Sequence, residues 1–192
     1  SGVSASDAAR RFGFKTAVSS FDEIIGDPEI GVIFIANRHN QHAELVIKSL
    51  LAGKPTFVEK PLCLNREELE QIRSAYMATE APLMVGYNRR FAPIVGKIRE
   101  SFKEIQYPIS MHYRINAGFI PTDNWIQDPE CGGGRVIGEI CHFIDLLSYL
   151  SGARPVKVHA EALSMPNDRF RSDDNLQLVI RFSNGSVGTI NY

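Results

Sequence analysis

The spacing of apolar residues changes once along this chain of 192 residues. Up to about residue 102, short continuous apolar runs alternate with segments in which apolar residues recur every three or four positions. Beyond about residue 109, apolar and polar residues alternate strictly. Continuous runs are typical of strands buried on both faces of a parallel sheet, whereas strict alternation is typical of strands with one polar face. The sequence therefore predicts an α/β protein with two differently built sheets.

The first half is predicted to be a parallel sheet with connecting helices. Residues 31–36, 56–59 and 83–86 are continuous apolar runs of strand length. Helical spacing is found in the segments that begin at Ser4, Ser20, Ala43, Asn65 and Pro93. Side-chain caps are predicted for three of these helices by the pairs Ser4 and Asp7, Ser20 and Glu23, and Asn65 and Glu68. Helix and strand alternate with short joints, which indicates βαβ units.

The second half is predicted to be an α+β unit with a mostly antiparallel open sheet. Its strictly alternating segments are residues 109–115, 156–162 and 176–182. Asn184 and Gly185 favour a tight turn into a last strand. One helix over 136–150 follows three glycines and ends near Gly152. The boundary between the two halves is expected between residues 102 and 109.

Composition excludes several classes of protein. Hydrophobic residues make up 44% and charged residues 22%, as in ordinary globular proteins. No apolar run is long enough to cross a bilayer, so no membrane partner is expected. Lys and Arg number 21 against 22 for Asp and Glu, which leaves no basic surface for nucleic acid and favours a small neutral ligand. The three cysteines form no C-x-x-C pair, and this favours a reducing, cytoplasmic environment.

Polar side chains follow each predicted strand of the first sheet. They lie in residues 37–42, in the Glu59-Lys60-Pro61 sequence and in residues 87–90. Because the carboxyl ends of parallel strands share one edge, these segments are expected to share one ligand-binding crevice. Lys60 is a candidate proton carrier there, held between Glu59 and the rigid Pro61. The alternative interpretation is a surface lysine paired with Glu59.

A second polar cluster lies in the second half. It consists of residues 125–134, with three successive glycines, followed by Glu139, His142 and Asp145 on one predicted helix. His142 is a candidate proton carrier, which Asp145 could orient from the same helical face. The alternative is a half-buried interface histidine beside a surface carboxylate, with the glycines acting as a hinge.

Two further histidines are three residues apart near a predicted helix start. His39 and His42 could ligate a metal, but no third ligand stands at a fixed spacing, so loop or capping roles are favoured and no metal is expected. A metal hydrolase built from these two histidines with His142 and Asp145 is the least favoured hypothesis.

Taken together, the motifs resemble the Gfo/Idh/MocA family of NAD(P)-dependent oxidoreductases. The matching segments, in chain order, are residues 31–36, 42–44, 52–54, 59–61, 86–91, 125–134, His142 and Asp145. Two of these regions, residues 38–42 and 138–142, further resemble the C-terminal module of bi-domain oxidoreductases, in which this unit follows a zinc-type alcohol dehydrogenase-like part.

The resemblance implies a fold, an activity and a set of site residues. Residues 1–104 would be part of a Rossmann NAD(P)-binding domain, and residues 105–192 a substrate and dimerisation domain that forms a homo-oligomer through its sheet. Hydride would pass between NAD or NADP and a sugar- or cyclitol-like hydroxyl, with Lys60 and His142 as catalytic residues. The implied cofactor-binding residues are Asn37, His42, Glu59, Lys60 and Asn88. The implied substrate residues are Asn116, Trp125, Glu139, His142 and Asp145.

Two departures from the family pattern bear on activity. Gly138 stands where many members have an aspartate, and the nearest carboxylate is Glu139. The sequence also has no G-x-G-x-x-G turn, whose backbone N–H groups would hold the pyrophosphate. We therefore expect an excerpt of a longer protein, cut also after Tyr192, that alone binds dinucleotide weakly and is inactive. The alternative function is a non-catalytic sugar-binding or assembly module.

Overall fold

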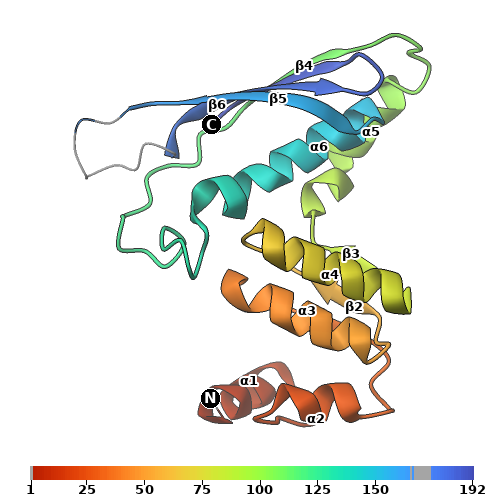
Figure 1. Cartoon of the computed structure of the whole chain (residues 1–192), viewed down its shortest axis with the longest axis vertical. Coiled ribbons are helices and arrows are strands. Elements are labelled where there is room, and N and C mark those ends of the chain that lie inside the picture. Colours follow the sequence, from red (N-terminus) through yellow and green to blue (C-terminus); the bar gives the residue numbers. More distant parts are fainter. Residues whose placement is uncertain (1, 165, 167–173) are drawn as a thin grey trace.

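The chain forms two sheets at different heights of an elongated molecule (Figure 1). A computed structural model describes residues 2–164, 166 and 174–192. The first sheet and its helices contain residues up to Val85, and the second sheet begins at Ser110. Among the described residues, no helix has both the length and the apolar character needed to span a membrane.

Two short helices open the chain. Helix α1 spans Gly2–Phe12 and therefore begins before Ser4, so the predicted start of this helix at Ser4 is wrong. Helix α2 spans Phe21–Gly26 and has the predicted capping box. The Ser20 hydroxyl accepts the backbone N–H of Asp22 at 3.2 Å, while the Glu23 carboxylate accepts the N–H of Ser20 at 3.3 Å. This cap sets the start of α2 because its first N–H groups have no partner within the helix.

The first sheet is parallel throughout, as predicted. Its strands β1 (Ile33–Ile35), β2 (Thr56–Val58) and β3 (Leu83–Val85) stand in the order β1-β2-β3. Helix α3 (His42–Leu51) connects the first two strands and α4 (Arg66–Thr79) connects the second pair. Asn65 caps α4 by accepting the backbone N–H of Glu68 at 2.8 Å, which confirms the cap predicted there.

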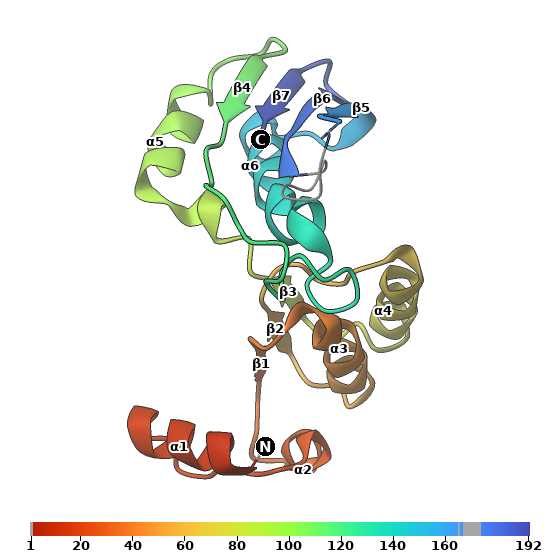
Figure 2. The ribbon, with the colours of Figure 1, turned by 90° about the vertical axis from the view of Figure 1, so that its left-hand side faces the viewer.

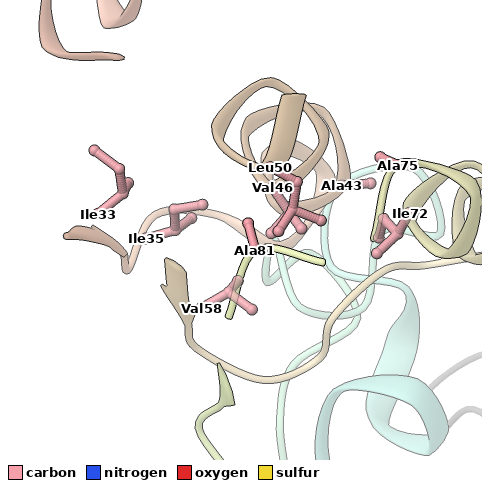
Figure 3. Close-up of a cluster of buried hydrophobic side chains, with 9 residues drawn as sticks. All are labelled: Ile33, Ile35, Ala43, Val46, Leu50, Val58, Ile72, Ala75 and Ala81. Atoms are coloured by element: carbon pink, nitrogen blue, oxygen red, sulfur yellow. The ribbon is translucent and has the colours of Figure 1, made fainter. Parts of the chain in front are cut away.

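Only one face of this sheet is buried by the described residues. Ile33, Ile35 and Val58 pack with Val46 and Leu50 of α3 and with side chains of α4 (Figure 3). On the opposite face Phe34 is 70% exposed. The prediction of strands buried on both faces is therefore wrong for the described residues, because α3 and α4 pack on the same face.

A short connection leads to the second sheet. It contains the 3-10 helix η2 (Asn88–Phe91) and helix α5 (Pro93–Ser101), which begins at the predicted proline. The strands of the second sheet are β4 (Ser110–Arg114), β5 (Pro155–Ala162), β6 (Leu176–Phe182) and β7 (Val187–Asn191), in the order β4-β7-β6-β5. β5, β6 and β7 are antiparallel, but β4 and β7 are parallel. The sheet is thus mostly antiparallel, since residue alternation reports a strand's faces and not the direction of its neighbour.

Helix α6 (Cys141–Ser151) covers part of the second sheet. Phe143 and Leu147 of α6 pack against Ile180 and Phe182 of β6 and Ile190 of β7. β6 alternates between buried and exposed residues as predicted. Every residue of β5 is exposed, so its predicted buried row is wrong. The reason is that β5 is an edge strand, outside the cluster that α6 buries.

Candidate functional site

A segment of the second half reaches down to the carboxyl edge of the first sheet. The chain between β4 and α6 descends beside β3 and α3 before it turns into α6 (Figure 2). It ends in a π-helix, η3 (Val136–Ile140), that runs directly into α6. The predicted helix over 136–150 is therefore two helical segments of different geometry. The strand exits of the first sheet and η3 form the candidate site.

Lys60 joins the two halves of the molecule at this site. It lies two residues beyond β2, and its ammonium group donates a hydrogen bond of 2.9 Å to the backbone carbonyl of Gly138 in η3. The partner is thus a carbonyl oxygen, and no ion pair joins Lys60 to Glu59 within the part of the chain that the structure describes. The alternative of a surface lysine paired with Glu59 is not supported.

His142 lies on the first turn of α6, near Lys60. Its ring is 8% exposed, and Tyr87 meets it edge-on with 6.2 Å between ring centroids. Burial, and then the positive charges of Lys60 and Arg89, lower the pKa of His142 to about 4. The Nδ1 atom is buried without a hydrogen-bond partner among the described residues. His142 is therefore a neutral imidazole at neutral pH that can accept a proton.

Three glycines let the segment before η3 fold into a tight loop. The backbone N–H groups of Gly132 and Gly133 both donate to the carbonyl of Asp128, at 2.8 and 2.9 Å, and Gly134 donates to Ile126 at 2.9 Å. A Cβ atom on Gly132 would lie 2.4 Å from backbone atoms of Ile126. Gly133 and Gly134 both have a φ of +75°. These glycines are required by close backbone packing, which argues against a flexible hinge.

The residues that follow β1 contact this loop. A short 3-10 helix, η1 (His39–Gln41), follows β1, and its buried His39 ring places Nδ1 2.8 Å from the Gly132 carbonyl. The backbone N–H of Asn40 donates to the carbonyl of Cys131 at 3.1 Å. The Trp125 ring lies edge-on to His39, with 5.0 Å between centroids. These three contacts hold Trp125 and its loop against the first sheet.

The predicted cofactor residues all stand at the exits of the three strands. Asn37 is exposed and its amide donates to Gln41 at 2.7 Å, while Asn88 begins η2 after β3. Glu59 directs its carboxylate toward Gly86, where an added Cβ would lie 3.1 Å from Oε2. His42 is fully buried and places its two ring nitrogens 2.7 Å from the Pro61 carbonyl and 3.1 Å from the Asn37 carbonyl. The His42 ring therefore bridges the segment that follows β1 and the segment that follows β2.

The predicted substrate residues fall into two groups. Trp125 and His142 lie at the site, as described above. The carboxylate of Glu139 accepts the Tyr192 hydroxyl at 2.5 Å and lies 3.5 Å from Nε of the buried Arg135. Asp145 is bound by the Arg90 guanidinium through two hydrogen bonds. Asn116 is exposed in the loop after β4.

Sequence reasoning missed the partners of these side chains. Arg90, Arg135 and Tyr192 engage the two acidic residues, and Tyr87 contacts His142. One signal for Arg135 was available, because it is a charged residue at the start of an otherwise apolar helical segment. The other partners are too distant in sequence for any local pattern to reveal.

Within the described part of the chain, the histidines are not grouped with enough other possible ligands to hold a metal ion. Among the residues that the structure describes, no three His, Cys, Asp or Glu side chains are placed to hold one ion. Both ring nitrogens of His42 face backbone carbonyls, and Asp145 is engaged by Arg90. The hypothesis of a metal hydrolase is therefore not supported by these donors.

Comparison with protein families identifies the chain. Residues 2–87 match the family described as "Oxidoreductase family, NAD-binding Rossmann fold", and residues 104–192 match the "GFO/IDH/MocA C-terminal domain". The chain belongs to the Gfo/Idh/MocA family. The two matches fall on either side of η2 and α5, the connection between the two sheets.

Individual relatives agree with this membership. The levoglucosan dehydrogenase of Pseudarthrobacter phenanthrenivorans is 31% identical, over 97% of this chain and 55% of its own length. The myo-inositol 2-dehydrogenase of Thermotoga maritima is 26% identical, over 94% of this chain and 54% of its own. A solved structure of levoglucosan dehydrogenase with NADH and levoglucosan superimposes with a TM-score of 0.86 at 32% identity, covering 100% of this chain and 55% of that one. The chain thus spans about half the length of these relatives.

Proposed function

We propose that this chain belongs to an oxidoreductase that transfers a hydride between NAD or NADP and a sugar- or cyclitol-like hydroxyl or carbonyl group. The observation that carries the proposal is the meeting of Lys60 with the π-helix that leads into His142, at the carboxyl edge of a parallel sheet. The names of the relatives, a levoglucosan and a myo-inositol dehydrogenase, support a polyhydroxylated substrate.

The two side chains are suited to complementary roles in proton transfer. The neutral His142 can take the proton of a substrate hydroxyl, because burial and nearby cations keep it unprotonated. The Lys60 ammonium can donate a hydrogen bond to the same oxygen and stabilise negative charge that develops there. Nicotinamide, when bound, would accept or supply the hydride. The unpartnered Nδ1 of His142 and the polar exits at Asn37, Glu59 and Asn88 fit a site for the nicotinamide half of the cofactor.

Replacement of Lys60 tests this proposal. In the complete natural protein, Lys60→Met should reduce turnover by about 10²-fold or more, because a positioned donor that stabilises developing negative charge contributes rate enhancements of that order. The measurement is absorbance of reduced nicotinamide with a panel of sugars and cyclitols. Lys97→Met, at an exposed position of α5, is the matched control and should leave turnover unchanged. Unchanged turnover in Lys60→Met would contradict the role of Lys60.

The isolated 192-residue chain is proposed to bind dinucleotide weakly and to be inactive. The chain has no G-x-G-x-x-G turn, and in Rossmann domains that turn supplies the backbone donors for the pyrophosphate. Titration calorimetry with NAD should give no saturation at micromolar concentrations. A micromolar dissociation constant for this chain alone would refute this part of the proposal.

A second candidate function is a non-catalytic sugar-binding or assembly module. Gly138 favours it, because no carboxylate stands at that position of the π-helix beside Lys60. The two functions differ in their products: a binding module retains a sugar without reducing or oxidising nicotinamide. Sugar binding without any absorbance change in the complete protein would support the second function over the first.

We further infer that the complete protein is of the bi-domain type and that it is cytoplasmic. We also infer that it forms a homo-oligomer through the second sheet. The three free cysteines, all within the described residues, support a reducing compartment. The wholly exposed edge strand β5 supports association through the sheet, because unpaired strand edges and uncovered apolar side chains favour contact with another chain. Light scattering of the complete protein would measure the oligomeric state.

A further inference from the structure

His39, in the segment after β1, is a buried titratable residue to which the proposed mechanism gives no role. It is 8% exposed. Its ring contacts Gly132 and Trp125 of the loop of residues 125–134, and it also lies beside Gly138 of the π-helix. The backbone carbonyl of Gly138 in turn accepts a hydrogen bond from the Lys60 ammonium group.

We propose that His39 is a positioning residue for Lys60, acting through the backbone of Gly138. This inference rests on the proposed function, because it concerns the group that meets the substrate oxygen. The His39 ring lies where a side chain at position 138 would be placed. A Cβ atom on Gly138 would be 3.2 Å from Cε1 of His39, which is tighter than ordinary van der Waals contact. The imidazole therefore fills the space that a side chain at 138 would occupy.

The contact constrains the carbonyl that Lys60 uses. Gly138 is buried within η3, and its oxygen accepts the Lys60 ammonium at 2.9 Å. A glycine without lateral support has wide backbone freedom. The His39 ring supplies that support on one side, and its own position is set by the 2.8 Å contact with Gly132 and by the Trp125 ring. A chain of packed groups thus runs from β1 to the ammonium of Lys60.

The charge of His39 suits this role. Burial, followed by the nearby positive charges of Lys60 and His42, lowers its pKa, while the Gly132 carbonyl acts in the opposite direction. The ring is therefore neutral at neutral pH, with the Nδ1 proton donated to Gly132. A neutral ring can pack beside an ammonium group without repelling it, whereas a lysine or arginine at position 39 would repel it.

Three variants of the complete natural protein separate positioning from general stability. His39→Ala removes both the ring and the donor, and Gly138→Ala adds a methyl group against the ring. His39→Asn keeps an N–H donor near the position of Nδ1 but lacks Cε1, the ring atom nearest Gly138, so it should rescue only part of the loss. We expect kcat to fall about tenfold or more in the first two variants, with KM for the nicotinamide cofactor changed less than about threefold, because misplacement of a reacting group acts mainly on the chemical step.

A second readout does not depend on turnover. The pKa of His142 is lowered in part by the Lys60 ammonium, so it reports the place of that group. NMR titration of the histidine ring protons should give a higher pKa for His142 in Lys60→Met. The same direction of shift is expected in His39→Ala and Gly138→Ala, and a return toward the original value in His39→Asn. His112→Ala, at an exposed position of β4, is the matched control and should leave the pKa of His142 unchanged.

The outcomes distinguish this inference from the proposed function. If His39→Ala and Gly138→Ala fold, as judged by thermal unfolding, and leave both kcat and the pKa of His142 unchanged, the positioning role is overturned. If these variants shift the pKa of His142 while the unmodified protein oxidises no polyol, the positioning of Lys60 stands and the proposed reaction fails. If Gly138→Ala does not fold, His39→Ala and His39→Asn decide the matter by the same two measurements.

Discussion

His142 shows how burial keeps a common side chain in its neutral form. An exposed imidazole titrates near pH 6.5, whereas the ring of His142 is almost enclosed and faces two cations. Among the described residues, none is placed to accept a hydrogen bond from Nδ1 of this ring. The groups around His142 therefore keep its ring neutral at neutral pH.

Acidification should therefore destabilise the protein through His142. Its pKa is lowered in the folded state, so the unfolded chain binds the proton more readily than the folded chain does. The stability that the neutral ring contributes is complete above about pH 6.5 and is lost as the pH falls toward 4. We expect a loss on the order of 2 kcal/mol between these values, measured by urea unfolding.

Two histidine variants check the origin of this loss. His142→Asn removes the titrating group and should make the dependence of the unfolding free energy on pH shallower between pH 6.5 and 4. His112→Asn, on the exposed face of β4, should leave the slope as it is. An identical slope in His142→Asn and the original protein would show that other groups account for the acid sensitivity.

The loop of residues 125–134 and the π-helix after it form one structural unit. Successive glycines allow backbone N–H groups to converge on the Asp128 carbonyl, and the loop is then held by η1. The π-helix turns the chain so that the carbonyl of Gly138 meets Lys60 and His142 follows on α6. Short π segments within helices are often found at functional sites.

The loop should not tolerate a side chain at Gly132. Gly132→Ala would place a Cβ atom 2.4 Å from the Cα and carbonyl oxygen of Ile126, and backbone atoms cannot move aside cheaply. We expect a loss of roughly 2–3 kcal/mol in the free energy of unfolding, because the loop must open to accept the methyl group. Chemical denaturation followed by Trp125 fluorescence measures this change.

Gly96 is the matched control for that substitution. It lies in α5 with no atom within 4 Å of an added Cβ, and its φ is not positive. Gly96→Ala should raise the free energy of unfolding by about 0.5–1 kcal/mol, because alanine favours the helix. If both substitutions had the same small effect, the close packing of Gly132 against Ile126 would be disproved.

The two halves of the molecule are joined by a few specific contacts. Arg90, after β3, binds Asp145 of α6 through two hydrogen bonds, and the Arg89 guanidinium lies 4.7 Å from the centroid of the Phe143 ring. Together with the contacts of Lys60 and His39 described above, they set the first sheet against α6. Asp145 is therefore accounted for by a structural role, and its predicted contact with substrate stays a prediction.

Removal of Arg90 should lower the free energy of unfolding, because Arg90 joins the two halves of the molecule through Asp145. Arg90→Leu would leave the Asp145 carboxylate, whose side chain is 10% exposed, without its partner. We expect a loss of roughly 1–3 kcal/mol, since breaking such a pair leaves an uncompensated charge. The double variant Arg90→Leu, Asp145→Leu should recover most of this loss, because neither charge then remains.

An exposed ion pair supplies the control for that experiment. Lys103 and Glu100 form a pair in which both side chains are more than 70% exposed, at 72% and 73%. Lys103→Ala should change the free energy of unfolding by less than about 1 kcal/mol, because water screens such pairs. A double Leu variant as unstable as Arg90→Leu alone would argue that the cost arises from lost packing and not from the unpaired carboxylate.

Local order in the chain was predictable to a large extent. The three strands of the first sheet, the caps at Ser20 and Asn65 and the proline start of α5 follow from interactions within a few residues. Alternation along β6 likewise predicted its buried and exposed faces. Apart from the start of α1, the errors concern burial, at Phe34 and along β5, because burial depends on which distant element covers a face.

The site was predictable in its residue types but not in its contacts. Polar residues after parallel strands indicated a ligand edge, and Lys60 and His142 were identified as candidates with the help of family resemblance. The partners of Gly132 and Gly138 are 93 and 78 residues away in sequence, and no short pattern encodes contacts across such separations. Periodicity and capping settled the helices and strands, because those forces act between neighbours along the chain. Folding alone settled the neutral state of His142, the support of Gly138 by His39 and the engagement of Asp145, because desolvation and charge pairing depend on groups that only the folded chain brings together.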